Sequence, residues 1–175
     1  SISYGHLSKI VQPIFQLPPL RYTIYITTSC NFNCSYCHVI TGLNQKQDRL
    51  SLNEWEKVTK NILPFSVVSI SGGEPLLASE TLALIKMLRK KRILVTMVTN
   101  GSSLVTSTLR KIEDSGLNYL MISVDGVGKT HDESRSFKGS FAKIKKALEE
   151  IDKSFNIKVG IKTVVTDENH HELID

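Results

Sequence analysis

The sequence has no long hydrophobic run, no secretory signal pattern and no fourth cysteine. Its longest apolar stretches, such as residues 93–98, are far shorter than the roughly 20 residues that a membrane-spanning helix needs. The N-terminus lacks the charged-then-apolar pattern of a signal peptide. All three cysteines fall within residues 30–37, so they do not make the disulfide framework of a secreted domain. These absences predict a cytoplasmic protein without a membrane partner.

The composition is that of an ordinary soluble domain. Of the 175 residues, 41% are hydrophobic and 22% are charged, and a chain of this length buries a core without metals or disulfides. The net charge of +5 is a mild excess. Basic residues cluster only at 89–92 and 143–147, both in predicted helices, where a solvated helix face is the simpler interpretation. We therefore expect no nucleic-acid partner, and attraction to an anionic substrate or to RNA is the weaker alternative.

Strand and helix patterns alternate along most of the chain. Runs rich in β-branched and aromatic residues predict five strands, at residues 21–27, 65–70, 93–99, 117–124 and 157–165. Apolar residues at helical spacing predict helices at residues 51–63, 79–92, 103–116 and 140–155, with one more beginning at 169–175. Strands that alternate with helices pair in parallel through right-handed crossovers.

Three signals mark helix ends. Ser51 and Glu54 have the spacing of a capping box. Asn169 and Glu172 repeat that spacing near the end of the chain. Gly116 suits the C-cap of the third predicted helix.

The predicted fold class is α/β, an open sheet or partial barrel of parallel strands. A closed eightfold barrel would need roughly 250 residues. Residues 1–20, which contain two adjacent prolines, are predicted to be an irregular lead-in segment. Residues 21–175 form the predicted core domain, which we expect to be incomplete at its C-terminal end.

Unusual residues follow each of the first four predicted strands. The cysteines follow the first, and the sequences SGGEP (71–75), TNG (99–101) and SVDG (123–126) follow the next three. In parallel α/β folds the chemistry lies at the carboxyl ends of the strands. The four loops are therefore expected to form the rim of a single site.

The cysteines are spaced C-x3-C-x2-C, as Cys30, Cys34 and Cys37. Zinc sites need four protein ligands, or three and a water, and His38 is awkwardly placed as a fourth because it is adjacent to Cys37. A thioredoxin-like pair of Cys34 and Cys37 would leave Cys30 without a role. Three thiolates can instead hold three irons of a [4Fe–4S] cluster and leave the fourth iron open. We favour the cluster because the other loops accompany it.

The SGGEP loop can be an ordinary turn or a ligand cradle. Gly72 and Gly73 would let the backbone approach a ligand closely, and Pro75 would end the strand. Glu74 would then place a carboxylate where it accepts a hydrogen bond from a ligand ammonium group.

The later loops offer further polar groups. Asn100, at the end of the third strand, can reach a ligand hydroxyl or amide. Ser123 and Asp125 point to the same side of the fourth strand's end. Arg135, in the predicted loop 131–141, offers a cation to a ligand carboxylate. His131 is interpreted as a loop or capping residue rather than a proton-transfer group.

Together these motifs resemble the radical S-adenosylmethionine (SAM) superfamily. The resemblance rests on CNFNCSYC, with aromatic Tyr36 before the third cysteine, followed by GGEP, TNG and SVDG, and it covers about residues 21–173. The sequence after SVDG is similar to the subgroup that modifies peptides and proteins or builds heme-type and quinone cofactors. The resemblance implies a partial (β/α)6 barrel, whose sixth strand this sequence does not show.

The resemblance also implies a set of cofactor contacts. Cys30, Cys34 and Cys37 would bind a [4Fe–4S] cluster, and the methionine part of SAM would chelate its open iron. The turn formed by Gly72, Gly73, Glu74 and Pro75 would hold the SAM amino group. Further contacts would be Ser123 and Arg135 with the carboxylate, Asn100 or Asp125 with the ribose, and Tyr36 and Val164 with the adenine.

The implied activity is reductive cleavage of SAM to a 5′-deoxyadenosyl radical, which abstracts hydrogen from a substrate. The implied partners are an electron donor such as flavodoxin or ferredoxin, and a peptide, protein or small-molecule cofactor precursor as substrate. A non-catalytic iron–sulfur or zinc-binding interaction domain is the alternative.

Overall fold

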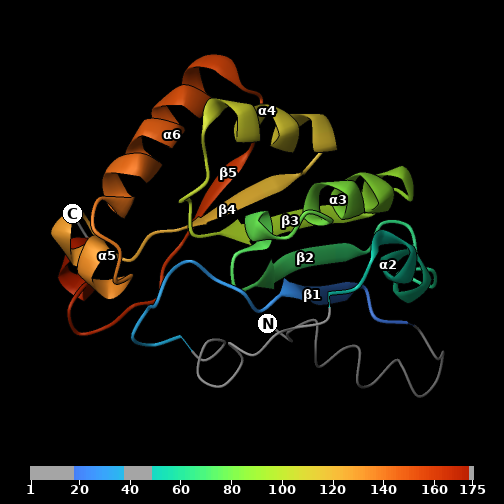
Figure 1. Cartoon of the computed structure of the whole chain (residues 1–175), viewed down its shortest axis with the longest axis horizontal. Coiled ribbons are helices and arrows are strands. Elements are labelled where there is room, and N and C mark those ends of the chain that lie inside the picture. The colour runs from blue at the N-terminus through green and yellow to red at the C-terminus, as the bar shows by residue number, and fades with distance from the viewer. Residues whose placement is uncertain (1–17, 38–48, 174–175) are drawn as a thin grey trace, which may run out of the picture.

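The computed structural model of the chain describes residues 18–37 and 49–173. Most of the predicted lead-in segment lies outside these residues, as does His38. The described residues contain one sheet of five parallel strands, in the order β1-β2-β3-β4-β5 (Figure 1). The partial-barrel prediction is therefore confirmed. No helix in the described ranges is long and apolar enough to cross a membrane.

The elements have the following bounds. The strands are β1 Arg21–Thr27, β2 Val67–Gly72, β3 Leu94–Thr99, β4 Tyr119–Ser123 and β5 Val159–Lys162. The α-helices are α2 Leu52–Val58, α3 Thr81–Lys90, α4 Thr106–Ser115, α5 Lys129–Ser134 and α6 Ser140–Ser154. Two short 3-10 helices are η1 Pro75–Leu77 and η2 His170–Leu173.

All five predicted strands and four predicted helices are present, most with shorter ends. The second strand, predicted at 65–70, is shifted by two residues and includes Ser71 and Gly72 of the SGGEP sequence. The capping box of α2 is confirmed, because Ser51 N donates to Glu54 Oε2 at 2.8 Å and Glu54 N donates to Ser51 Oγ at 3.4 Å. Gly116 caps α4 with a φ of 74°, in the left-handed region that glycine adopts without strain.

Two predictions near the site are wrong. Part of the predicted loop 131–141 forms α5, a helix of six residues that begins without a side-chain cap and so leaves no N-terminal signal in the sequence. The capping box of Asn169 and Glu172 does not form. Glu172 instead accepts hydrogen bonds from Val127 N at 2.6 Å and Thr130 Oγ1 at 2.6 Å, and the segment is a 3-10 turn.

The core lies between the sheet and the helices that cover one of its faces (Figure 1). Alternate strand side chains point into it and are completely buried: Val68, Ile70, Val95, Met97, Leu120 and Ile122. Each fully buried side chain of this size contributes roughly 1.5–3 kcal/mol. On the other face, small or polar residues such as Ser69 and Thr96 pair across β2 and β3 and are only partly buried. That face extends to the carboxyl ends of the strands.

Gly72 and Gly73 bring the end of β2 against the chain that continues from β1. Gly73 N donates to Thr27 O at 2.8 Å, and Glu74 N donates to Ser29 O at 2.9 Å. A Cβ on Gly73 would overlap the carbonyl oxygen of Ser29. These glycines therefore have a packing role that the sequence analysis did not include: they dock the segment that leads into the cysteines.

Replacing Gly73 by alanine should lower the free energy of unfolding by about 3 kcal/mol, at the upper end of overpacking effects, because backbone rather than a flexible side chain blocks the new methyl group. Urea denaturation at neutral pH measures the loss. Gly139→Ala is the matched control, since no atom lies within 4 Å of its Cβ and only the left-handed φ of 81° is penalised, by about 1 kcal/mol. Equal losses in the two variants would contradict the packing role.

Candidate cofactor site

A cavity of about 240 Å³ lies at the carboxyl edge of the sheet. Ten of the predicted site residues line it: Cys30, Cys34, Cys37, Tyr36, Gly72, Gly73, Asn100, Ser123, Arg135 and Val164. Eight of them come from the four loops that the sequence placed on one rim, while Arg135 lies at the end of α5 and Val164 follows β5. The structure thus brings those loops together around one hollow. Glu74, Pro75 and Asp125 are not among its lining residues.

The cysteine loop is held by its neighbours rather than by regular structure. Phe32, which is 4% exposed, stacks on Phe137 with 4.5 Å between ring centroids. A tight turn follows, in which Cys37 N donates to Cys34 O at 3.1 Å. Each of the three thiols is partly buried, and all of them face the same cavity.

The donor set fits a cluster held by three thiolates. Thiolate sulfur is the usual protein ligand of iron–sulfur clusters, and here three thiols on one loop border a hollow. In the part of the chain that the structure describes, no three histidine, cysteine, aspartate or glutamate side chains are already grouped as a metal site. A cluster at this place would need the three thiols to converge on it. Burial raises the pKa of Cys30 and Cys34, so cluster binding must also displace their protons.

Glu74 turns inward and joins the ends of two strands. Its fully buried carboxylate accepts hydrogen bonds from Asn100 N at 2.7 Å, Thr99 Oγ1 at 2.8 Å and Leu76 N at 3.1 Å. Burial raises the pKa of Glu74, while these three donors act in the opposite direction. Pro75 is buried behind it as the first residue of η1. In this structure the carboxylate is fully engaged inside the protein.

Asn100 is fixed on the rim by Glu74 and by the cysteine loop. Its side-chain Nδ2 donates to Asn31 Oδ1 at 2.9 Å and lies 3.8 Å from Cys30 Sγ. Its Oδ1 accepts from Ser102 N at 2.9 Å. The side-chain amide of Asn100 therefore borders the cavity, and its hydrogen bonds join it to Asn31 in the cysteine loop and to Ser102 in its own loop.

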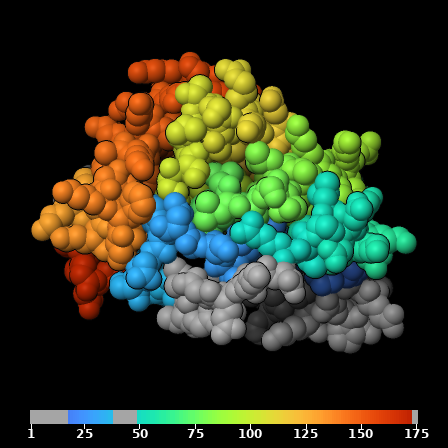
Figure 2. Space-filling model, viewed as in Figure 1, coloured from blue at the N-terminus to red at the C-terminus, as the bar shows by residue number. Residues whose placement is uncertain are grey.

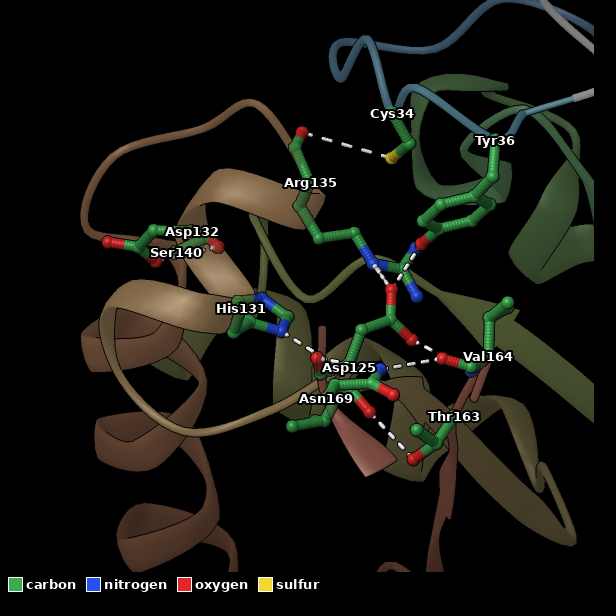
Figure 3. Close-up of polar contacts among 11 residues, drawn as sticks. Cys34, Tyr36, Asp125, His131, Asp132, Arg135, Ser140, Thr163, Val164 and Asn169 are labelled. Carbon is green, nitrogen blue, oxygen red and sulfur yellow. Dashed lines mark hydrogen bonds and ion pairs between the residues drawn. The ribbon is translucent and has the colours of Figure 1, made fainter. Parts of the chain in front are cut away.

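Asp125 is the centre of a buried polar network (Figure 3). Its carboxylate is fully buried and contacts three segments of the chain. It accepts a short hydrogen bond from the Tyr36 hydroxyl, another from Val164 N at 2.9 Å, and pairs with Arg135 Nε at 2.6 Å. The backbone takes part too, because Asn169 Nδ2 donates to Asp125 O at 3.1 Å.

The network keeps Arg135 charged and Tyr36 protonated. Burial alone would lower the pKa of Arg135, but the charge of Asp125 outweighs it and raises that pKa. Burial and the hydrogen bond to Asp125 raise the pKa of Tyr36. The Arg135 guanidinium also lies 5.6 Å from the centroid of the Tyr36 ring, a cation–π contact. Both side chains still border the cavity.

Asp125→Asn should lower the free energy of unfolding by about 3–5 kcal/mol, because it leaves the buried Arg135 guanidinium without an anionic partner. Tyr36→Phe removes one hydrogen bond from the same carboxylate and should lower it by about 1 kcal/mol. Urea denaturation of both variants gives the comparison. A loss for Asp125→Asn no larger than that for Tyr36→Phe would show that the ion pair does not hold the rim.

His131 occupies a completely buried position in α5, not a loop as expected. Its Nδ1 accepts a hydrogen bond from Asp125 N at 3.1 Å, so Nε2 carries the proton. Nε2 finds no hydrogen-bond partner among the residues that the structure describes. Burial and the nearby Arg135 charge lower the pKa of His131. The folded protein therefore holds this histidine neutral.

Stability should fall as the pH drops below about 6.5, the ordinary pKa of histidine, because the unfolded chain then binds a proton that folded His131 resists. Urea denaturation at pH 7.5 and at pH 5.5 measures the change. In His131→Asn, whose side-chain oxygen can replace Nδ1 as acceptor, the drop over this range should be smaller. An undiminished drop in that variant would assign the pH dependence to other groups.

Sequence reasoning missed Tyr25 and Lys162, which also line the cavity. Tyr25 pairs in register with Ser71, and Lys162 with Ser123. Lys162 forms no ion pair with any described residue. The available signal was the two-residue period of the strands, since Lys162 precedes Val164 by two positions and shares its side of the chain.

The Radical SAM superfamily profile matches residues 24–175. The chain therefore belongs to the radical SAM superfamily, as its motifs indicated.

The chain is also similar to particular members. It is 29% identical over 150 residues to a pre-heme d1 synthase of Dinoroseobacter shibae, which covers 85% of this chain and 37% of that protein. It is 25% identical over 159 residues to the sporulation killing factor maturation protein SkfB of Bacillus subtilis, covering 90% and 38%. Crystal structures of Streptococcus suis SuiB share the fold at 21% identity. The SAM-bound form has a TM-score of 0.75 and covers 97% of this chain and 40% of that one. The chain spans about two fifths of the length of these proteins.

Proposed function

We propose that this chain is the SAM-cleaving domain of a radical SAM enzyme. Cys30, Cys34 and Cys37 would hold a [4Fe–4S] cluster, and SAM would occupy the adjoining cavity. The observation that carries the proposal is that the three thiols and seven other predicted site residues border one hollow at the strand ends. An electron donor such as flavodoxin or ferredoxin, and a cytoplasmic setting, belong to the same proposal.

Different residues of the cavity wall would recognise different parts of SAM. The backbone at Gly72 and Gly73 would receive the amino group. Ser123 and the charged Arg135 side chain would bind the carboxylate, since a guanidinium pairs well with carboxylates. Tyr36 and Val164 would border the adenine, with Asn100 near the ribose.

Two residues act through others in this proposal. Glu74 positions Asn100 by accepting its backbone hydrogen bond. Asp125 positions both Tyr36 and Arg135. Neither carboxylate borders the cavity, so we assign them to support of the site rather than to contact with SAM.

A cluster held by Cys30, Cys34 and Cys37 would supply the one-electron reduction needed for the cleavage of SAM and for hydrogen abstraction from the substrate. The residues of the chain would hold SAM in place and exclude water and other hydrogen donors from it. Phe32 and Phe137 close the side of the cysteine loop, and the half-buried Tyr36 ring covers the cavity wall. These groups limit the access of water and of stray hydrogen donors to the reacting atoms.

A peptide, a protein or a cofactor precursor is the substrate class that we propose. SkfB is named as a maturation protein of a killing factor, and SuiB has been crystallised with its precursor peptide SuiA. The pre-heme d1 synthase supports the cofactor-precursor option. The open polar face of the sheet, with Tyr25 and Lys162 at the cavity, is where we expect the substrate to enter.

Anaerobic reconstitution with iron and sulfide should give a brown protein that forms 5′-deoxyadenosine from SAM when dithionite is added. Cys34→Ala should lose both the cluster absorbance and the cleavage, because two thiolates cannot retain the cluster. Ser35→Ala, its exposed neighbour on the same loop, is the matched control and should keep both. A protein that takes up iron but never cleaves SAM would sink the proposal, and zinc alone after anaerobic purification would favour a metal-binding interaction domain.

A further inference from the structure

A surface of unpaired lysines lies beside the cysteine loop. Between residues 136 and 148 the chain carries lysines but no acidic residue. Lys138, Lys143 and Lys146 are exposed, and the last two share a face of α6 because they are three residues apart. None of the three forms an ion pair with a described residue. We call these three residues the lysine surface.

An apolar hollow lies next to the lysine surface, between α5 and α6. It has a volume of about 600 Å³, and Phe137, Phe141 and Ala142 line it, with Lys138 at its rim. Two acidic residues also border it, one bonded to the backbone and the other in an exposed ion pair. Asp132 accepts hydrogen bonds from Gly139 N and Phe141 N, and Glu133 pairs with Lys129 at 3.3 Å. An apolar centre with a charged rim is the usual anatomy of a protein docking site.

Aromatic rings connect this surface to the thiols. Lys143 Nζ lies 5.0 Å from the centroid of the Phe137 ring, and Phe137 stacks on Phe32. Phe32 N in turn donates to Cys30 Sγ at 3.4 Å. Cys34 Sγ lies 3.8 Å from the carbonyl oxygen of Arg135, two residues before Phe137. Figure 2 shows the α5–α6 region (orange) directly beside the segment that carries the cysteines (blue).

We propose that the lysine surface docks the acidic protein that delivers the electron for SAM cleavage. The donor is oxidised by one electron, and the cluster held by the three cysteines is reduced by one. Positive charge on this side attracts an acidic partner and steers its approach, and the short aromatic path places it next to the thiols. The inference rests on the proposed function for its purpose, but it makes a separate claim about binding.

The position of the other basic residues supports this choice of surface. Lys57, Lys60 and Lys91 border a second hollow at the far ends of α2 and α3. Those helix ends precede β2 and β3, so they lie at the amino edge of the sheet, opposite the cysteines. A donor docked there would be separated from the thiols by the length of the strands.

Direct binding is the first test, and it needs neither cluster nor activity. Oxidised flavodoxin and oxidised ferredoxin are titrated calorimetrically into the cluster-free protein at low ionic strength. Lys138→Glu/Lys143→Glu should weaken the binding of at least one of them about 10-fold, and added salt should shrink the difference. Lys57→Glu/Lys60→Glu makes the same change in net charge at the amino edge and should bind as the wild type does. Thermal melts confirm that both double variants are folded.

Cleavage of SAM by the reconstituted protein is the second test. With flavodoxin, its reductase and NADPH, Lys138→Glu/Lys143→Glu should form 5′-deoxyadenosine about 10-fold more slowly than the wild type. With dithionite, a small reductant that needs no docking surface, the two rates should be equal.

Four outcomes would overturn the proposal: wild-type protein that binds neither donor, equal weakening in both double variants, no weakening in either, or a matching loss with dithionite. Retention of an RNA oligonucleotide by the lysine surface without donor binding would overturn it as well. Donor binding that depends on the lysines in a protein that never cleaves SAM would sustain the docking surface and refute the proposed function instead.

Discussion

The buried carboxylate of Asp125 is the interaction on which the arrangement of the site depends. A charge with no exposure to water must be compensated, and here one cation and two hydrogen-bond donors compensate it. The partners come from the cysteine loop, the end of α5 and the segment after β5. Removing the compensation is costly, so these three irregular segments are held in one arrangement. The single carboxylate thereby holds the three loops together, as ladder hydrogen bonds hold neighbouring strands together.

A second set of contacts fixes the other end of the cysteine loop. Gly73 and Glu74 bond the backbone just before Cys30, and the Glu74 side chain bonds the loop that carries Asn100. The cysteine loop is thus tied to the sheet at its start and, through Tyr36, at its finish. Cys30 and Cys34 lie between these two ties, and Cys37 directly follows the second. All three thiols are partly buried at the cavity.

The sequence predicted the fold and the location of the site better than the roles of its polar residues. Strand and helix periods placed the elements, and the carboxyl-end rule placed four loops around one cavity. A short uncapped helix such as α5 leaves no comparable signal. The contacts of Glu74 with the SAM amino group, and of Asn100 or Asp125 with the ribose, stay predictions, while the carboxylates of Glu74 and Asp125 bond to donors within the protein. Sequence shows which loops meet, but which donors a carboxylate takes is decided by three-dimensional packing.

The ion pair has a consequence for the charge of the cavity. Asp125 pairs with Arg135 at Nε, although this Nε has no hydrogen-bond partner of good geometry among the described residues. A guanidinium has five donors, so its terminal nitrogens remain for another anion. The pair is neutral as a whole, and Lys162 is the cavity cation that no described acidic side chain compensates. SAM carries a cationic sulfonium, an ammonium and one carboxylate, so a site made strongly positive would repel it. In the proposed function, the internal pairing of Arg135 would let the site offer guanidinium hydrogen bonds to the carboxylate of SAM without the full positive charge that would oppose the sulfonium. Lys162, at the end of β5, borders the same cavity and would add positive charge where we expect the substrate.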